Sequence, residues 1–188
     1  MIKLTERDIQ IKEFLKTVVV ADTETIHQIF FKNASLRTCQ ARLKLLVDYK
    51  VIRVFREDIF SQNIYCLKKP ASYKHKIVFS KLLGKLHKEG IEVLKYVTPL
   101  KISNIIADGF IAVKVDGETR LYFVEVELTK YFDTKKYIDL YYSRAYKEKF
   151  PIMPNILVIS DKRVNTDKAL NITKCKLDLS DLNIKRGY

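Results

Sequence analysis

The sequence predicts a mixed α and β protein built from two domains. The prediction rests on the order of helices and strands expected in each of two regions of the sequence. Residues 1–67 contain three short helical segments and then a β-hairpin, and residues 75–188 follow the order helix, three strands, helix, strand. Residues 68–74 lie between them and include Lys-Lys-Pro-Ala-Ser, which is typical of a linker. A length of 188 residues suffices for two small domains.

Capping signals mark the three helices of the first expected domain. Thr5 with Asp8 three positions later forms a capping-box pattern, Asp22 or Thr23 precedes the second helix, and Ser35 precedes the third. The run Val18-Val19-Val20 is β-branched, and we expect it to interrupt the chain between the first two helices. The apolar face expected for the third helix consists of Leu36, Cys39, Leu43, Leu46 and Val47.

Residues 51–56 and 63–67 flank the turn Glu57-Asp58 and predict a β-hairpin. Three helices followed by a hairpin is the order of a winged helix-turn-helix, whose third helix enters the major groove of DNA. Double-stranded DNA is therefore the expected partner, with a homodimer as the expected state. The residues expected to contact DNA are Arg37, Thr38, Gln40, Arg42, Lys44, Arg53 and Arg56. A solvated helix face in a protein-interaction module is the alternative.

The charge favours the same class of partner. The net charge of +13 indicates that the partner is a polyanion. Residues 1–67 carry 11 Lys and Arg against 8 Asp and Glu, so most of the excess follows residue 67. This favours a second phosphate-contacting surface, or else a helix whose lysines are merely solvated. The sequence has no apolar run of membrane-spanning length and no Cys-x-x-Cys pair, so we expect a cytoplasmic protein that does not contact membranes.

In the second expected domain, Asp116-Gly117 is a hairpin signal between two alternating runs. The two strands expected around it span 105–115 and 119–128. Further strands are expected at 92–97 and 155–160, and helices at 73–88, 131–150 and 166–171.

Three carboxylates, Asp108, Glu125 and Glu127, lie on the two strands of this hairpin, where acids are uncommon and costly to bury. Side chains alternate along a strand, so Glu125 and Glu127 share a face. If Asp108 points the same way, Asp108 and Glu125 can bind Mg²⁺, which activates water against a phosphodiester. Alternatively, Glu125 and Glu127 lie on an exposed strand face and pair with Lys114 or Arg120 across the hairpin.

Two segments, LTERDIQIKEFLKTVVVADTETIHQIFF and SLRTCQARLKLLVDYKVIRVFR, resemble the start of the replication-relaxation family of plasmid and mobile-element proteins. The Leu-Thr-x-Arg-Asp opening and the Arg-Thr third helix carry the likeness, together with the later Asp-Gly and Glu-Val-Glu strands. The resemblance implies a DNA-binding protein of a plasmid, phage or integrative element. Its role would be in replication, DNA relaxation or transfer, or transcriptional control, or as an adaptor that recruits a replication or transfer protein.

The order of elements from residue 75 resembles the restriction-endonuclease-like, PD-(D/E)xK fold, with Asp108 and Glu125-Val126-Glu127 at the motif positions. That resemblance implies a Mg²⁺-dependent nickase or endonuclease. Glu127, however, stands where active members usually carry lysine. The candidates to replace that lysine are Lys130 or, on the following helix, Lys135 and Lys136. Two hypotheses stay open: a nuclease using Asp108, Glu125, Glu127 and Lys130, or a non-catalytic relative of that fold that binds DNA without a cofactor.

Overall fold

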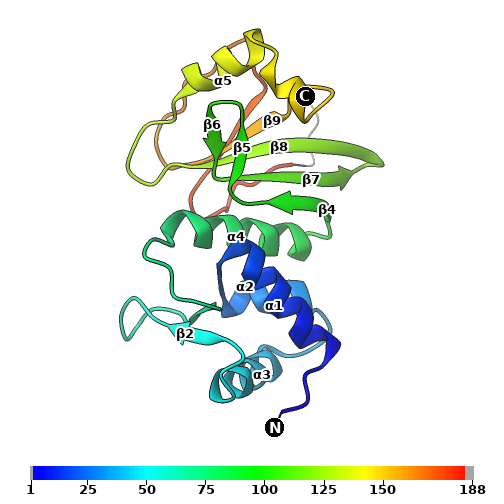
Figure 1. Cartoon of the computed structure of the whole chain (residues 1–188), viewed down its shortest axis with the longest axis vertical. Coiled ribbons are helices and arrows are strands. Elements are labelled where there is room, and N and C mark those ends of the chain that lie inside the picture. The colour runs from blue at the N-terminus through cyan, green and yellow to red at the C-terminus, as the bar shows by residue number, and fades with distance from the viewer. Residues whose placement is uncertain (1, 185–188) are drawn as a thin grey trace. The chain divides into compact units, whose positions relative to one another are not determined.

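The protein is described by a computed structural model that covers residues 2–184 (Figure 1). It combines helices with a mixed sheet, which agrees with the expected mixed α and β class. The chain divides into two compact units, Met1–Gly90 and Ile91–Tyr188. The division falls at Gly90 and not in the linker expected at 68–74. The helix that follows this linker therefore belongs to the N-terminal unit.

The N-terminal unit contains four helices and three short strands. In chain order they are α1 (Glu6–Val18), β1 (Val20–Asp22), α2 (Thr23–Phe30), α3 (Leu36–Asp48), β2 (Arg53–Phe55), β3 (Ile64–Cys66) and α4 (Lys74–Lys88). The strands form an antiparallel sheet in the order β1-β3-β2. The expected caps are present, because Thr5, Asp22 and Ser35 each accept a hydrogen bond from a backbone N–H of the helix that follows. Strand β1 was not expected, because the sequence indicated only an interruption up to Val20 and a possible helix cap at Asp22.

Helix α4 packs on α2 and β1. Gly84 allows the close approach, since a Cβ there would lie 2.6 Å from Gln28 Oε1 and 3.2 Å from Thr25 Cα. Lys81 also pairs with Asp22 at 3.5 Å. With α4 included, the N-terminal unit carries 18 Lys and Arg against nine Asp and Glu, a net charge of +9. Most of the positive charge thus belongs to the unit with the three expected helices, contrary to the distribution inferred from the linker position.

The C-terminal unit contains a five-stranded sheet in the order β10-β9-β8-β7-β4. Strands β4, β7 and β8 are antiparallel, and β8, β9 and β10 are parallel. A separate hairpin is formed by β5 and β6. The elements are β4 (Glu92–Val97), β5 (Leu100–Ile102), β6 (Ile105–Ala107), β7 (Gly109–Val115), β8 (Glu118–Val126), α5 (Thr134–Tyr142), the 3₁₀ helix η1 (Ala145–Glu148), β9 (Asn155–Ile159) and β10 (Ile172–Cys175).

One face of this sheet packs against α5, which is drawn above the strands in Figure 1. Tyr137 and Leu140 of α5 join a core with sheet residues that include Phe123 and Val158. Residues on the opposite face, such as Val124, are buried as well. Burial on both faces explains why the sequence of β9 reads as a continuous apolar run.

Three expected elements differ from the structure. The helix expected at 131–150 is shorter, because α5 ends at Tyr142 and Arg144 adopts a left-handed conformation with φ of 58° before η1. The helix expected at 166–171 is absent, and that segment forms turns ahead of β10. The strand expected at 105–115 is interrupted at Asp108, between β6 and β7. By contrast, Asp116-Gly117 forms the expected turn, with positive φ at both residues.

Candidate functional site

Helix α3 presents a polar, basic face to solvent. Arg37, Thr38, Gln40 and Lys44 are all exposed. The opposite face holds the helix in the core through residues Cys39, Leu43 and Leu46, whereas Leu36, expected on that face, is exposed. The first turn of α3 contains no acidic residue. Four of the five α3 side chains expected to contact DNA therefore lie where a polyanion can reach them.

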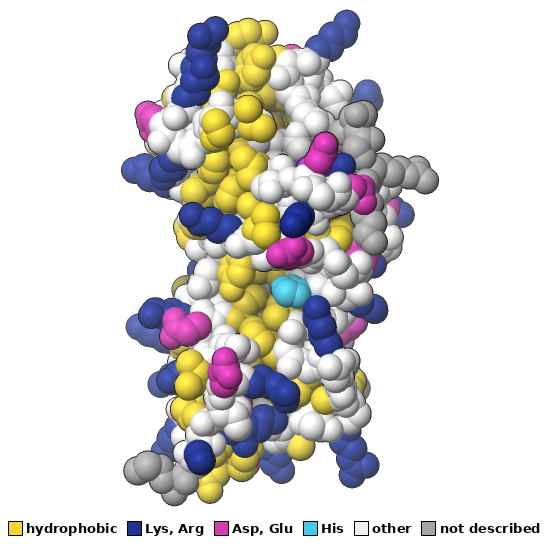
Figure 2. Space-filling model, turned by 90° about the vertical axis from the view of Figure 1, so that its right-hand side faces the viewer, with side chains coloured by type: hydrophobic (Ala, Val, Ile, Leu, Met, Phe, Trp, Pro, Cys, Tyr) yellow, Lys and Arg dark blue, Asp and Glu magenta, His cyan; other side chains and the backbone are white. Residues whose placement is uncertain are grey.

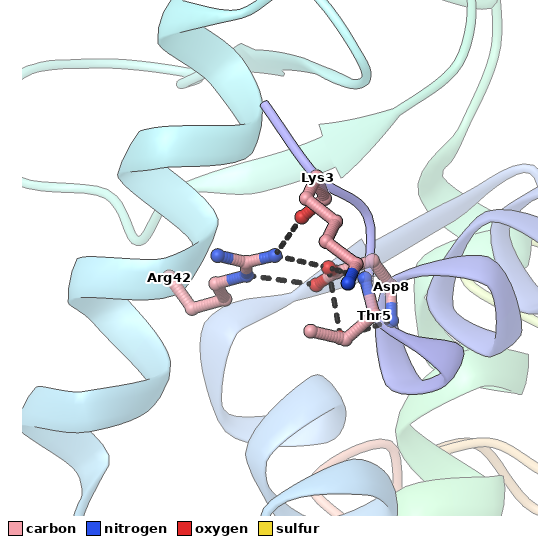
Figure 3. A network of polar contacts seen from close by, with 4 residues as sticks. All are labelled: Lys3, Thr5, Asp8 and Arg42. Atoms are coloured by element: carbon pink, nitrogen blue, oxygen red, sulfur yellow. Dashed lines mark hydrogen bonds and ion pairs between the residues drawn. The ribbon is translucent and has the colours of Figure 1, made fainter. Parts of the chain in front are cut away.

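Arg42 is the exception, since it points from α3 toward the start of α1 (Figure 3). Its Nε donates to Asp8 Oδ1 at 3.0 Å, and its Nη2 bonds Asp8 Oδ2 and the Lys3 carbonyl. Asp8 is fully buried. Burial alone would raise the pKa of Asp8, but hydrogen bonds from Arg42 and Thr5 outweigh it and lower this pKa to about 2. The structure thus places Arg42 in an ion pair within the fold, not on the face expected to contact DNA.

The β2–β3 hairpin carries the other two residues expected to contact DNA. Arg53 and Arg56 are both exposed, and Arg56 Nε donates to Asn63 Oδ1 at 2.6 Å across the hairpin. A cleft of about 520 Å³ lies between the hairpin loop and the helices. It is lined by residues of α2, by Leu36 and Gln40 of α3, and by loop residues that include Arg56. The start of α3 and the hairpin loop therefore face a common space.

In the C-terminal unit, Asp108 and Glu125 lie at the same end of the β7–β8 pair. Asp108 Oδ2 accepts the Val126 N–H at 2.9 Å. Glu125 is almost completely buried, and its Oε1 accepts hydrogen bonds from Lys136 Nζ and Tyr137 Oη, both at 2.6 Å. Burial raises the pKa of Glu125, the Lys136 and Tyr137 contacts oppose this rise, and the charge of Asp108 adds to it. We call Asp108, Glu125, Lys136 and Tyr137 the acid–lysine cluster.

The structure shows which of the contacts expected for these acids form. The lysine that contacts Glu125 is Lys136 of α5, whereas Lys130 is exposed in the preceding loop. Glu125 does not pair across the hairpin with Lys114 or Arg120, because it faces α5 and Arg120 donates to the carbonyl of Ile184.

Glu127 lies just past the end of β8 and is half-buried. Its N–H donates to the Ile159 carbonyl at 3.0 Å, so the backbone pairing with β9 continues through it.

Tyr137 was not foreseen as a partner of Glu125. It is fully buried at the start of α5, where its ring stacks on Phe132 with centroids 5.7 Å apart. Burial, together with the adjacent carboxylate of Glu125, raises the pKa of its hydroxyl. The sequence signal that points to Tyr137 is its place next to Lys136 in the first turn of a helix that follows the acidic strand.

Metal binding would depend on the two carboxylates of the acid–lysine cluster. Across residues 2–184, no three His, Cys, Asp or Glu side chains are grouped closely enough to hold a metal ion. Mg²⁺ is commonly held by only one or two carboxylates, with waters and substrate phosphates as its remaining ligands. Asp108 and Glu125 fit that smaller donor set.

Comparison with models of protein families, with curated proteins and with solved structures finds no significant match. The replication-relaxation and PD-(D/E)xK resemblances therefore stay predictions from the sequence. None of the helices within residues 2–184 has the length and apolar character needed to cross a membrane.

Proposed function

We propose that this protein binds double-stranded DNA through α3 and the β2–β3 hairpin of its N-terminal unit. The observation that carries the proposal is the exposed stripe of Arg37, Gln40 and Lys44 on α3, on the same unit as the exposed arginines of the hairpin. The element order α1-β1-α2-α3-β2-β3, with strand order β1-β3-β2, supports a winged helix-turn-helix.

The spacing of the α3 residues suits a groove. Gln40 follows Arg37 by three positions and Lys44 follows Gln40 by four, so the three side chains share one side of the helix. Arginine and glutamine can form paired hydrogen bonds with guanine and adenine edges, respectively. Ala41, exposed between Gln40 and Lys44, is small enough to let the helix approach the bases. Arg53, exposed on the hairpin, would contact phosphates.

The unit's net charge of +9 supports a polyanionic partner. On the face drawn in Figure 2, Lys and Arg side chains are spread widely over the surface. Nonspecific attraction to phosphates would then bring the protein to DNA, and the α3 side chains would select the sequence.

The sequence resemblance supports a role at a replication, transfer or control region of a plasmid, phage or integrative element. A homodimer would read two half-sites about 34–36 Å apart, one turn of DNA. In the adaptor version of this proposal, the C-terminal unit recruits a replication or transfer protein to the bound site.

Selection from a random duplex library, followed by anisotropy titrations across a range of NaCl concentrations, tests the proposal. The expected result is an enriched motif and an affinity that falls steeply with salt, with a slope of about −0.9 per phosphate contacted. Failure to enrich a motif, together with an affinity that does not respond to salt, would overturn it.

A second candidate function, cleavage of a phosphodiester, is favoured by one observation, the contact of Lys136 with Glu125 beside Asp108. An acid pair with an adjacent ammonium group is the donor set implied by the PD-(D/E)xK resemblance, although the lysine comes from α5 and not from β8. Asp108 and Glu125 would hold Mg²⁺, which polarises the scissile phosphate and activates water. Lys136 would hold Glu125 in position and keep it ionised.

Incubation of supercoiled plasmid with the purified protein and Mg²⁺ or Mn²⁺ tests this second function. Nicking that is lost in both Asp108→Ala and Lys136→Met would support it. If wild-type protein leaves the plasmid supercoiled with either metal, the acid–lysine cluster is structural and the C-terminal unit serves binding only.

A further inference from the structure

Two large apolar side chains stand in solvent at the tip of the β2–β3 hairpin. Ile59 is 79% exposed and Phe60 is 93% exposed. Single exposed apolar residues are common on proteins, but two adjacent ones at a projecting tip indicate a contact surface.

The loop that displays them is held by hydrogen bonds. The Asp58 carboxylate accepts the backbone N–H groups of Phe60 and Ser61, both at 2.8 Å, and the Ser61 hydroxyl at 2.7 Å. The other acid of the loop, Glu57, forms an ion pair with Lys74 at 3.3 Å, so both acids have partners within the protein. The apolar tip is therefore presented by a defined turn rather than by a loose loop.

The surroundings of the tip argue for a nucleic acid and not for an apolar protein surface. The stem below it carries the exposed Arg53 and Arg56. The cleft behind Ile59 and Phe60 is shared with Gln40 on the proposed reading face of α3. A nucleic acid matches both parts of this hairpin, because its phosphates can pair with the basic stem and the flat faces of its bases can contact the apolar tip.

We infer that Ile59 and Phe60 form a wedge that enters the groove beside the α3 contact and partly unstacks one base step of the bound duplex. This inference rests on the proposed DNA binding by α3. Apolar side chains inserted between base steps kink DNA, and the cost of unstacking is offset by the larger contact surface that the bend allows. The wedge would therefore make binding sensitive to the flexibility of a base step that α3 does not touch.

Phe60→Ala tests the wedge, because the side chain is so exposed that its removal leaves the fold intact. Ile152→Ala is the matched control, since Ile152 is 64% exposed but belongs to the C-terminal unit. The probe is the selected duplex, with 2-aminopurine placed in turn at each step flanking the motif. Wild-type protein should raise 2-aminopurine fluorescence at one step. Phe60→Ala should abolish that rise and weaken binding about 10- to 100-fold, and Ile152→Ala should change neither.

Three other outcomes would overturn the wedge. In the first, Phe60→Ala keeps both the fluorescence rise and the affinity while Arg37→Ala loses affinity, so the wedge fails and the α3 proposal stands. In the second, Phe60→Ala changes the molar mass of the free protein in light scattering, which makes the tip an interface between two copies. In the third, wild-type protein selects no duplex, so the proposed function itself fails.

Discussion

Replacing Arg42 by alanine should lower the stability of the fold, because Arg42 pairs with Asp8 inside the protein and does not lie on the face expected to contact DNA. Asp8 is fully buried, and the substitution would leave its carboxylate without the guanidinium that pairs with it. Removing one partner of a buried ion pair costs about 3–5 kcal/mol. The Arg42 side chain is 24% exposed, so the loss belongs at or below the lower end of that range.

The titration of Asp8 gives a second estimate, which covers the hydrogen bonds from Arg42 and Thr5 together, net of the opposing effect of burial. Its pKa is lowered from 3.8 to about 2. A shift of that size corresponds to about 2.4 kcal/mol of stability. Because the folded-state pKa is the lower one, this stability is present above pH 4 and is lost as the pH falls toward 2. We therefore expect Arg42→Ala to lower the free energy of unfolding by about 2–3 kcal/mol at pH 7.

Urea unfolding followed by far-ultraviolet circular dichroism, at several pH values, measures the change. Arg37→Ala is the matched control, since Arg37 is exposed on the same helix, and it should change stability by less than about 0.5 kcal/mol. The loss in Arg42→Ala should shrink as the pH approaches 2. The reasoning is refuted if Arg42→Ala keeps wild-type stability and weakens binding to the selected duplex as strongly as Arg37→Ala does.

Three further predictions concern the packing of α4, the acid–lysine cluster and the β7–β8 turn. Gly84→Val should destabilise the N-terminal unit by about 1–3 kcal/mol, because the new valine side chain would press on Thr25. Hydrogen exchange in α2 measures this loss, and unchanged exchange rates would count against the packing of α4 on α2. Lys136→Met should cost about 2 kcal/mol at pH 7 by leaving buried Glu125 without its cation. Because burial raises the pKa of Glu125, thermal melts should show a smaller loss as the pH is lowered and the carboxylate takes up a proton. Gly117→Val should lower the melting temperature, since Gly117 has φ of +82°; an unchanged melting temperature would contradict the turn conformation.

Local chemistry explains which elements the sequence predicted well. Ser35 caps α3 with its own hydroxyl, and Asp116-Gly117 closes the β7–β8 turn with positive φ values. Both features depend on residues a few positions apart, so they can be read from the sequence.

Long-range pairing explains what the sequence missed. Arg42 and Asp8 are 34 positions apart, and only the fold brings that guanidinium to that carboxylate. Strand β10 forms by parallel pairing with β9, so its own weakly patterned residues did not reveal it. Helix α4 packs on α2 through Gly84, a contact that the linker-like sequence before α4 did not indicate.

The acid–lysine cluster could be predicted only in part from the sequence. Alternation along the strand predicted only that Glu125 and Glu127 would share a face, and the lysine-rich start of the next helix supplied candidates for a partner. Choosing Lys136 over Lys130 required the position of α5 against the sheet, which places Lys136 Nζ 2.6 Å from Glu125 Oε1.

The affinity of Arg37→Ala for its selected duplex and for a random duplex tests the central claim most directly. Fluorescence anisotropy at one fixed salt concentration gives both constants. If α3 reads DNA, Arg37→Ala should weaken binding to the selected duplex by about 1–3 kcal/mol and change random-duplex binding much less. Equal losses on both duplexes, or no loss on either, would contradict the claim that α3 selects the sequence.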